Sequence, residues 1–242
     1  IRLRLQETPL FIELKARRGI EANPLRAALA GHNLRRLLIA LVVSFGQAVA
    51  WYTGIFWVLF FLQTAQGLDL VTTYRILVPG LVASPLLHAL AGWLSDLVGR
   101  KPVIMAGFAG AVAGYYPLYS LLGNVAGPGE FNYPAAAAIV VAMQLIPALV
   151  WGPLPALMAE LFPTAVRYSS LGLVQNTANG WAGGLVPLIT TAVYEGTGSL
   201  AWSLAYPIAL PLIALVFGLL FLPETSRGRF WLEVAPTRTG QE

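Results

Sequence analysis

The chain has 242 residues, of which 57% are hydrophobic and only 11% are charged. This composition, with a mean hydropathy of +0.69, lies outside the range of ordinary soluble domains and indicates an integral membrane protein. The absence of cysteine excludes disulfides and cysteine metal sites, and the 15 basic residues form no stripe with interleaved aromatic residues that would suit a nucleic acid.

The first residues, IRLRLQETPLFIELKARR, carry too many charges to cross a membrane. Thr8 can cap a helix that Pro9 starts. The apolar residues of that helix share one face: Leu10, Phe11 and Leu14. We predict that residues 1–36 are a cytoplasmic linker with a short amphipathic helix, and not a signal peptide. Because the chain starts with Ile1 and not Met, we expect further sequence upstream.

Six long apolar runs follow this linker. A helix needs about 20 apolar residues to cross a hydrocarbon core of roughly 30 Å. The runs have this length and lack the polar alternation of membrane strands. Their approximate bounds are 37–62, 76–97, 102–123, 134–158, 170–194 and 200–222. We therefore predict an all-α membrane protein, with a six-helix transmembrane bundle over residues 37–222 and a cytoplasmic tail over residues 223–242.

Basic residues are concentrated in alternate connections, and short loops rich in Lys and Arg stay in the cytoplasm. The segments on the predicted cytoplasmic side hold Arg17, Arg18, Arg26, Arg35, Arg36, Arg100, Lys101, Arg167, Arg227, Arg229 and Arg238. The three opposite connections hold Arg75 as their single base. We predict a multi-pass protein of the inner (plasma) membrane with both termini in the cytoplasm.

The connection after the second run reads GWLSDLVGRKPV, residues 92–103. It resembles the loop signature of the major facilitator superfamily, whose recurrent residues match Gly92, Asp96, Gly99, Arg100 and Lys101. The signature usually has a base directly after the aspartate, where this chain has Leu97, so we expect part of the charge network of that loop to be absent.

Four further segments agree with this resemblance. PALMAELFPTAVRYSSLG (residues 155–172) resembles the segment after the tenth helix of such transporters, and LPETSRGR (222–229) resembles the exit from their last helix. RLRLQETPLF (2–11) and NGWAGGLVPLI (179–189) are similar to the metabolite:proton symporter branch. The resemblance implies helices seven to twelve, the C-terminal half of the fold, built as two inverted three-helix repeats.

The resemblance also implies a conformational latch, because in the family this loop braces the cytoplasmic side and yields as the two halves rock. Gly92 would allow a close helix approach and Gly99 a tight turn. The alternative is a set of solvated surface pairs worth under about 1 kcal/mol. The predicted latch residues are Gly92, Asp96, Gly99, Arg100, Lys101, Glu160 and Arg167.

Candidate cavity residues are polar or aromatic side chains on the first and fourth runs. Gln47 and Trp51 share one face of the first run, with Tyr52 beside it. Gln144 and Trp151 share a face of the fourth run. The resemblance implies that the first helix of each three-helix repeat lines the substrate cavity, and these are those two helices. The alternative role of these residues is helix packing or interface anchoring.

Two further sets are weaker candidates. Asn176 and Asn179 belong to a small-residue stripe with Gly172, Gly180, Gly183 and Gly184, which favours helix packing over cavity lining. His88 is the one ionisable residue well inside a predicted helix, and we expect it to bond to a neighbouring helix in preference to relaying protons.

The predicted function is secondary transport of a small polar or anionic metabolite, coupled to protons by resemblance. No Asp or Glu lies at mid-membrane depth, so we place the coupling acid in the missing N-terminal six-helix half. The predicted partners are the metabolite, protons, the lipid bilayer and that half, with no cofactor or metal. A self-standing six-helix protein that dimerises into a carrier or acts as an interaction subunit is the alternative. An intramembrane hydrolase is disfavoured because His88 has no serine in a nucleophile setting.

Overall fold

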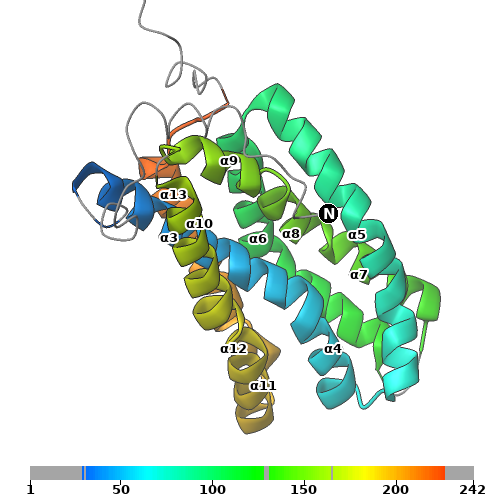
Figure 1. Ribbon diagram of the computed structural model, residues 1–242. Coiled ribbons are helices and arrows are strands. Elements are labelled where there is room, and N and C mark those ends of the chain that lie inside the picture. The colour runs from blue at the N-terminus through cyan, green and yellow to red at the C-terminus, as the bar shows by residue number, and fades with distance from the viewer. Residues whose placement is uncertain (1–28, 30, 128–130, 165, 227–242) are drawn as a thin grey trace, which may run out of the picture.

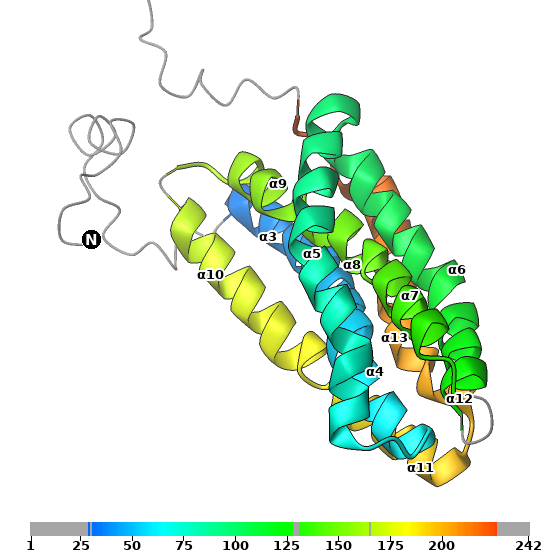
Figure 2. The same ribbon diagram turned by 90° about the vertical axis from the view of Figure 1, so that its right-hand side faces the viewer.

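The structure is a computed structural model that describes residue 29 and residues 31–127, 131–164 and 166–226. Within these ranges every regular element is a helix, as Figure 1 shows. The helices lie roughly side by side in an elongated bundle, which Figure 2 shows from a second direction. The prediction of an all-α fold is confirmed for the described residues. The amphipathic helix expected within residues 1–36 and most of the predicted tail lie outside them.

The first three helical runs agree closely with the predicted apolar runs. The first comprises α3 (Gly31–Tyr52), the π-helix η2 (Thr53–Trp57), α4 (Val58–Phe60) and the π-helix η3 (Phe61–Ala65). The second and third are single long helices, α5 (Leu70–Val98) and α6 (Arg100–Ala126).

The remaining runs are interrupted. The fourth comprises α7 (Tyr133–Met143), α8 (Leu145–Trp151) and α9 (Leu154–Leu161). The fifth comprises α10 (Arg167–Thr177), the π-helix η4 (Ala178–Gly183) and α11 (Val186–Thr197), and the sixth α12 (Leu200–Ser203) and α13 (Ala205–Phe221).

Three helices in the described ranges are long and apolar enough to cross a membrane: Asn33–Ala65, Leu70–Val98 and Tyr133–Leu161. α13 is apolar but has only 17 residues. α6 has the length, but its glycines, tyrosines and prolines make it less hydrophobic. Length and composition therefore support three of the six predicted spans, and the other three stay predictions.

Local chemistry explains where several helices begin and end. Asp69 caps α5 by accepting hydrogen bonds from the backbone N–H groups of Val71 and Thr72, at 2.9 and 3.0 Å. Hydrogen bonds from Thr72 lower the pKa of this exposed carboxyl. Asn132 caps α7 in the same way, accepting from Ala135 N at 3.1 Å. Gly198 ends α11 in the left-handed conformation, with φ of +63°.

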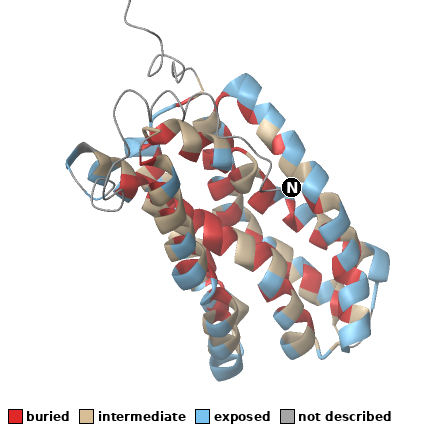
Figure 3. Ribbon diagram, in the orientation of Figure 1, coloured by how far each residue is buried: buried red, intermediate tan, exposed pale blue. Residues whose placement is uncertain are grey.

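Buried side chains form two apolar clusters along the bundle. One surrounds Trp57, Tyr119 and Met143, and the other surrounds Phe108, Leu157 and related residues nearer the opposite end. Figure 3 shows buried residues where the helices face one another and exposed residues along the outer faces. α5 is largely exposed along its length, as expected for a helix that faces lipid or another part of a larger protein.

The π-helix η2 is held from both sides by side-chain donors. Tyr115 and Tyr119 of α6 donate hydrogen bonds to the backbone carbonyls of Ala50 and Thr53, the latter at 2.6 Å. Gln144, between α7 and α8, donates to the carbonyl of Gly54 at 3.0 Å. π-Helical segments alter the regular carbonyl pattern, so donors from neighbouring helices stabilise this irregular stretch.

Candidate functional site

The charged candidate residues lie at one end of the bundle. The starts of α3, α6 and α10 and the ends of α5, α9 and α13 meet there, as Figures 1 and 2 show. α5 and α6 are joined through Gly99 alone, which adopts φ of +110°, a conformation that side chains other than glycine rarely adopt. The turn places the last residues of α5 directly beside the first residues of α6.

Arg100 is the centre of this charged cluster. Its guanidinium forms an ion pair with Asp96, four residues earlier near the end of α5, and donates to Ser95 Oγ at 2.7 Å. It also pairs with Glu160 of α9, 60 residues away, at 3.4 Å between Nη2 and Oε1. The Asp96 side chain is 59% exposed, so its pair contributes at most about 1 kcal/mol. The side chains of Arg100 and Glu160 are 13% and 23% exposed, so solvent screens their pair less.

Glu224, just beyond α13, is a central residue of the cluster that the sequence analysis did not single out. Its two carboxylate oxygens accept hydrogen bonds from the backbone N–H groups of Arg100 and Lys101, at 2.9 and 3.0 Å. Lys101 Nζ donates in return to the carbonyl of Leu219 at 2.9 Å. The start of α6 and the end of α13 therefore cap each other.

The exit segment after α13 also reaches α9. The Thr225 hydroxyl donates to Glu160 Oε2, while Arg100 binds the other oxygen of the same carboxylate. LPETSRGR contributed to the family resemblance, but no role was predicted for its acid. An acid immediately after a helix whose neighbour starts with uncapped N–H groups is the signal that could have identified Glu224.

The glycines of the latch set are explained by close contacts. A Cβ on Gly99 would lie 2.6 Å from Glu224 Oε2, so this position has no room for a side chain. A Cβ on Gly152, between α8 and α9, would lie 2.6 Å from the His88 carbonyl oxygen and 2.9 Å from Gly92 N. α5 and the α8–α9 junction therefore cross closely through this glycine pair.

The structure brings six of the seven predicted latch residues into one contiguous region, from the Gly92–Gly152 crossing to the α6 start. Arg167 begins α10, and its Nε donates to the Phe162 carbonyl at 3.2 Å, so it holds the α9–α10 connection.

A pocket of about 330 Å³ lies between α8–α9 and α10–η4. Three predicted cavity residues line it: Trp151, Asn176 and Asn179. Gln175 also lines it and was not predicted; its side chain accepts a hydrogen bond from Asn179 Nδ2 at 3.0 Å. The remaining wall is apolar, from Leu154, Pro155, Met158 and Leu171. Apolar walls with a few fixed amides are typical of small-molecule sites.

An aromatic cluster borders this pocket. The rings of Trp51 and Trp151 lie 6.2 Å apart between centroids, which joins the first and fourth helical runs. Tyr52 lies edge-on to Trp51 at 5.2 Å and stacks on Phe56 at 5.1 Å. Tyr52 also packs against Gly183 of η4, where a Cβ would approach the ring to 2.5 Å. Trp51, Tyr52 and Trp151 are each partly exposed, so the cluster keeps open surface.

The two predicted glutamines are deeply buried and differ in their hydrogen bonds. Gln144 donates to the Gly54 carbonyl through Nε2, while its Oε1 has no partner among the described residues. Gln47 lacks a partner there for both amide atoms, although it is only 1% exposed. Buried amides normally form hydrogen bonds, so Gln47 departs from the usual pattern within the described part of the chain.

His88 differs from its expected contact. The ring Nδ1 lies 2.7 Å from the Ser84 carbonyl oxygen and 3.3 Å from Ser84 Oγ, on its own helix. The expectation of a hydrogen bond to a neighbouring helix was wrong, because a ring one turn after Ser84 is within reach of that residue's carbonyl. The side chain is part-buried on α5 and does not line the pocket beside Trp151.

The small-residue stripe of the fifth run is only partly a packing surface. Gly183 packs tightly against Tyr52 and Ala48, as such a stripe predicts. A Cβ on Gly172 or Gly180 would meet nothing within 4 Å. Asn176 and Asn179 bond along their own helix, to the carbonyls of Gly172 and Gln175.

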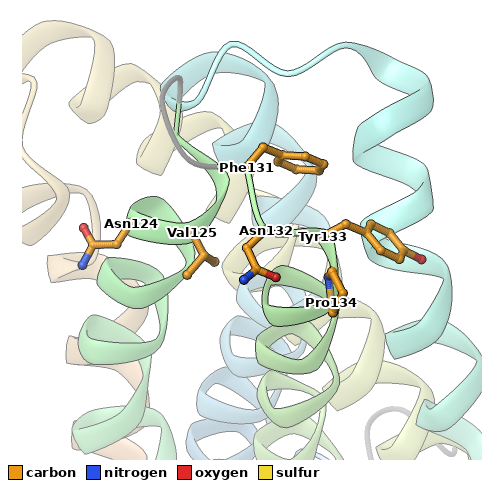
Figure 4. A pocket seen from close by; sticks show the side chains of 6 residues that line it. All are labelled: Asn124, Val125, Phe131, Asn132, Tyr133 and Pro134. Carbon is orange, nitrogen blue, oxygen red and sulfur yellow. The ribbon is translucent and has the colours of Figure 1, made fainter.

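A larger pocket, of about 500 Å³, lies at the α6–α7 connection and contains none of the predicted cavity residues. Figure 4 shows its lining, with Asn124 and Val125 from the end of α6 on one side and Phe131, Asn132, Tyr133 and Pro134 on the other. Asn132 is already engaged in capping α7. The described residues contain no group of three or more His, Asp and Glu side chains placed to hold a metal ion.

Known proteins related to this chain are transporters by description. Residues 10–233 match the family described as "Sugar (and other) transporter". The chain is 31% identical to the ectoine/proline transporter ProP of Corynebacterium glutamicum, over 94% of this chain and 45% of that protein. It is 25% identical to the glycine betaine/proline/ectoine/pipecolic acid transporter OusA of Dickeya dadantii, over 93% and 45%.

A shorter match is to the citrate-proton symporter of Klebsiella pneumoniae, 28% identical over 46% of this chain and 24% of that protein. No solved structure matches the chain. The chain spans about half the length of the first two relatives.

Replacing Glu224 by Gln tests the mutual cap of α6 and α13. The amide keeps one acceptor oxygen, so one of the two N–H groups at Arg100 and Lys101 loses its partner. We expect these two amides to exchange hydrogen roughly fivefold faster, which corresponds to about 1 kcal/mol of capping energy. Hydrogen-exchange mass spectrometry of the full protein measures this, with Glu195→Gln at an exposed site as the control.

The same cap predicts a pH dependence. Partial burial alone would raise the pKa of Glu224, but hydrogen bonds from the backbone N–H groups of Ser226, Arg100 and Lys101 outweigh it and lower the pKa. The carboxylate therefore stabilises the folded state fully above the ordinary pKa of Glu, and this stabilisation is lost as pH falls through the lowered value. Equal exchange rates in Glu224→Gln and the parent at neutral pH would contradict the cap.

Proposed function

Because the chain belongs to the sugar (and other) transporter family of the major facilitator superfamily, we propose that it is the C-terminal half of a secondary transporter for a small polar or anionic metabolite. The match over about 45% of two transporter relatives supports a half-length unit. This family membership is the observation that carries the proposal. The other half would supply the second wall of the substrate cavity.

The proposed topology has six membrane spans in two inverted three-helix repeats, with both termini in the cytoplasm of the cell. The helical order is compatible with it, since six successive helical runs make up the described bundle. The basic residues at the starts of α3, α6 and α10 support it as well, because they gather at the end that would face the cytoplasm. Arg75, near the start of α5, would then face the opposite side.

We place the substrate against the aromatic cluster of Trp51 and Trp151 and the pocket amides of Asn176 and Asn179. The pocket has no cationic side chain in its lining, which disfavours a multiply charged carboxylate. Tryptophan faces attract cations, and amides bind carboxylates without a full charge. Within the class of small polar metabolites, a zwitterion of the type named for ProP and OusA fits this lining best.

We further propose that transport is coupled to protons. A relative is named a citrate-proton symporter, which supports coupling to protons. The acids among the described residues lie near helix ends or in connections: Asp69, Asp96, Glu160, Glu195 and Glu224. A proton carrier inside the membrane would therefore belong to the other half of the transporter.

The charged cluster fits the role of a latch that holds one conformation of the carrier. Arg100 joins α5, α6 and α9 through Asp96 and Glu160, and Glu224 adds the end of α13. Each single contact is modest, so the whole set can break and re-form during a transport cycle.

Transport by the complete protein is the direct test. Reconstituted in proteoliposomes, it should accumulate at least one of ectoine, proline or glycine betaine when an inward proton gradient is imposed. Accumulation should fall to the equilibrium level without the gradient. Failure of every substrate in the panel, with the protein correctly inserted, would contradict the proposed function.

Removing the Trp151 ring should weaken substrate binding. Trp151→Ala deletes one face of the aromatic cluster, and we expect the apparent KM for a zwitterion to rise roughly 2- to 30-fold, as for the loss of about 0.5–2 kcal/mol of cation–π attraction. Trp151→Phe should recover most of the affinity. Trp202→Ala is the control, because that ring is exposed on α12. Matching KM values for Trp151→Ala and Trp202→Ala would return Trp151 to a packing role.

Asp96→Asn should reduce uptake sharply while leaving expression and folding intact. The carboxylate is mostly exposed, so losing its pair with Arg100 costs stability at most about 1 kcal/mol. A large loss of uptake would then reflect the conformational cycle. The control is Asp69→Asn at the other end of α5, where asparagine still caps the helix. Uptake by Asp96→Asn at the parent rate would remove Asp96 from the latch.

A further inference from the structure

A groove of about 400 Å³ runs between the first turns of α3 and the last turns of α13. Leu34, Leu38 and Ile39 form one wall, and Phe217 and Phe221 form the other. The two phenylalanine rings lie 4.6 Å apart between centroids and make a continuous aromatic surface. Both helix ends lie at the end of the bundle that carries the charged cluster (Figure 1).

The groove opens because α3 and α13 approach most closely further along. A Cβ on Gly46 would lie only 2.3 Å from the Cβ of Ala214, so the two helices touch at this point. Nearer the helix ends, the contact positions carry Leu and Phe, which hold the backbones apart. Leu38 and Phe221 remain 50% and 47% exposed in the groove.

Arg35 is the one ionisable side chain among the described residues that line this apolar groove. It is exposed and makes no hydrogen bond or ion pair within the part of the chain that the structure describes. Lys101, which also reaches α13, is by contrast engaged with the Leu219 carbonyl. Arg35 therefore offers a guanidinium to an external anion, directly beside apolar walls.

We propose that this groove binds an anionic phospholipid, with the phosphodiester on Arg35 and the upper part of an acyl chain between Leu38 and the two phenylalanine rings. An arginine at the end of a membrane-length helix lies at the depth of lipid headgroups. A free anion would leave the apolar walls in water, whereas a phospholipid satisfies both the charge and the walls. The volume lies within the roughly 300–1,000 Å³ of small-molecule sites.

The site goes beyond transport, since it lies on α3 and α13 and shares no residue with the pocket beside Trp151. Its test measures lipid binding by the protein itself and so stands or falls separately from the proposed function. The adjacent Arg36 provides a matched control, because it carries the same charge at the same helix start but does not line the groove. Replacing either arginine removes one positive charge from the start of α3, so both variants have the same effect on the orientation of the helix in the membrane.

The experiment is native mass spectrometry of the full protein after delipidation and exposure to dioleoylphosphatidylglycerol or, separately, dioleoylphosphatidylcholine. We expect Arg35→Gln to retain roughly five- to tenfold less phosphatidylglycerol than the parent, with phosphatidylcholine unaffected. Arg36→Gln should match the parent. Leu38→Trp, which fills the groove without changing charge, should also lose phosphatidylglycerol. Equal retention by Arg35→Gln and Arg36→Gln, whether both are reduced or both unchanged, would overturn the site.

A photocross-linker identifies the occupant directly. With p-benzoylphenylalanine in place of Leu34, irradiation in membranes that contain phosphatidylglycerol should attach the lipid. A cross-link to another segment of the protein in place of lipid would assign the groove to that segment and overturn the proposal. Thermal unfolding of each variant in detergent checks that the bundle is intact.

Discussion

Backbone groups that a helix cannot satisfy by itself must find partners within the protein when water is absent, and this requirement shapes the whole bundle. α6 begins without a side-chain cap of its own, and Glu224 from the other end of the chain binds its first N–H groups. Lys101 binds a carbonyl in the last turn of α13. The irregular stretch at η2 is held likewise by Tyr119 and Gln144. Long-range polar contacts thus gather where helices end or change their pitch.

These contacts connect the fold to its proposed action. Rigid, regular helices pack well but have few ways to change shape, while interrupted helices can shift between arrangements. The first, fourth, fifth and sixth runs contain interruptions, and the first, fourth and fifth also supply Trp51, Trp151 and Asn179 around the pocket. α5, α6 and the end of α13 are instead fastened together by the charged cluster. One end of the bundle is therefore held by ion pairs and hydrogen bonds, while the pocket wall is built from interrupted helices.

Hydropathy predicted the positions of the helical runs, because burying a 20-residue apolar segment dominates every local preference. The family resemblance placed Asp96 and Arg100 in one loop, but their ion pair was not predicted, because it depends on the turn at Gly99 between α5 and α6. Local spacing could not predict the hydrogen bond between Arg100 N and Glu224 or the one from Gln144 to Gly54. These bonds join residues 124 and 90 positions apart. His88 was misplaced because helix rotation, which sequence does not fix, decides whether a ring faces its own helix or the next.

Two buried glutamine side chains have amide atoms without hydrogen-bond partners among the described residues. Gln144 donates a hydrogen bond through Nε2 to the backbone of the first run, and its Oε1 has no partner among the described residues. Gln47 leaves both halves without one. An unpaired buried amide costs about 1–3 kcal/mol, which a purely structural position would have little reason to bear. A buried water would recover that energy, and neither glutamine lines the pocket beside Trp151.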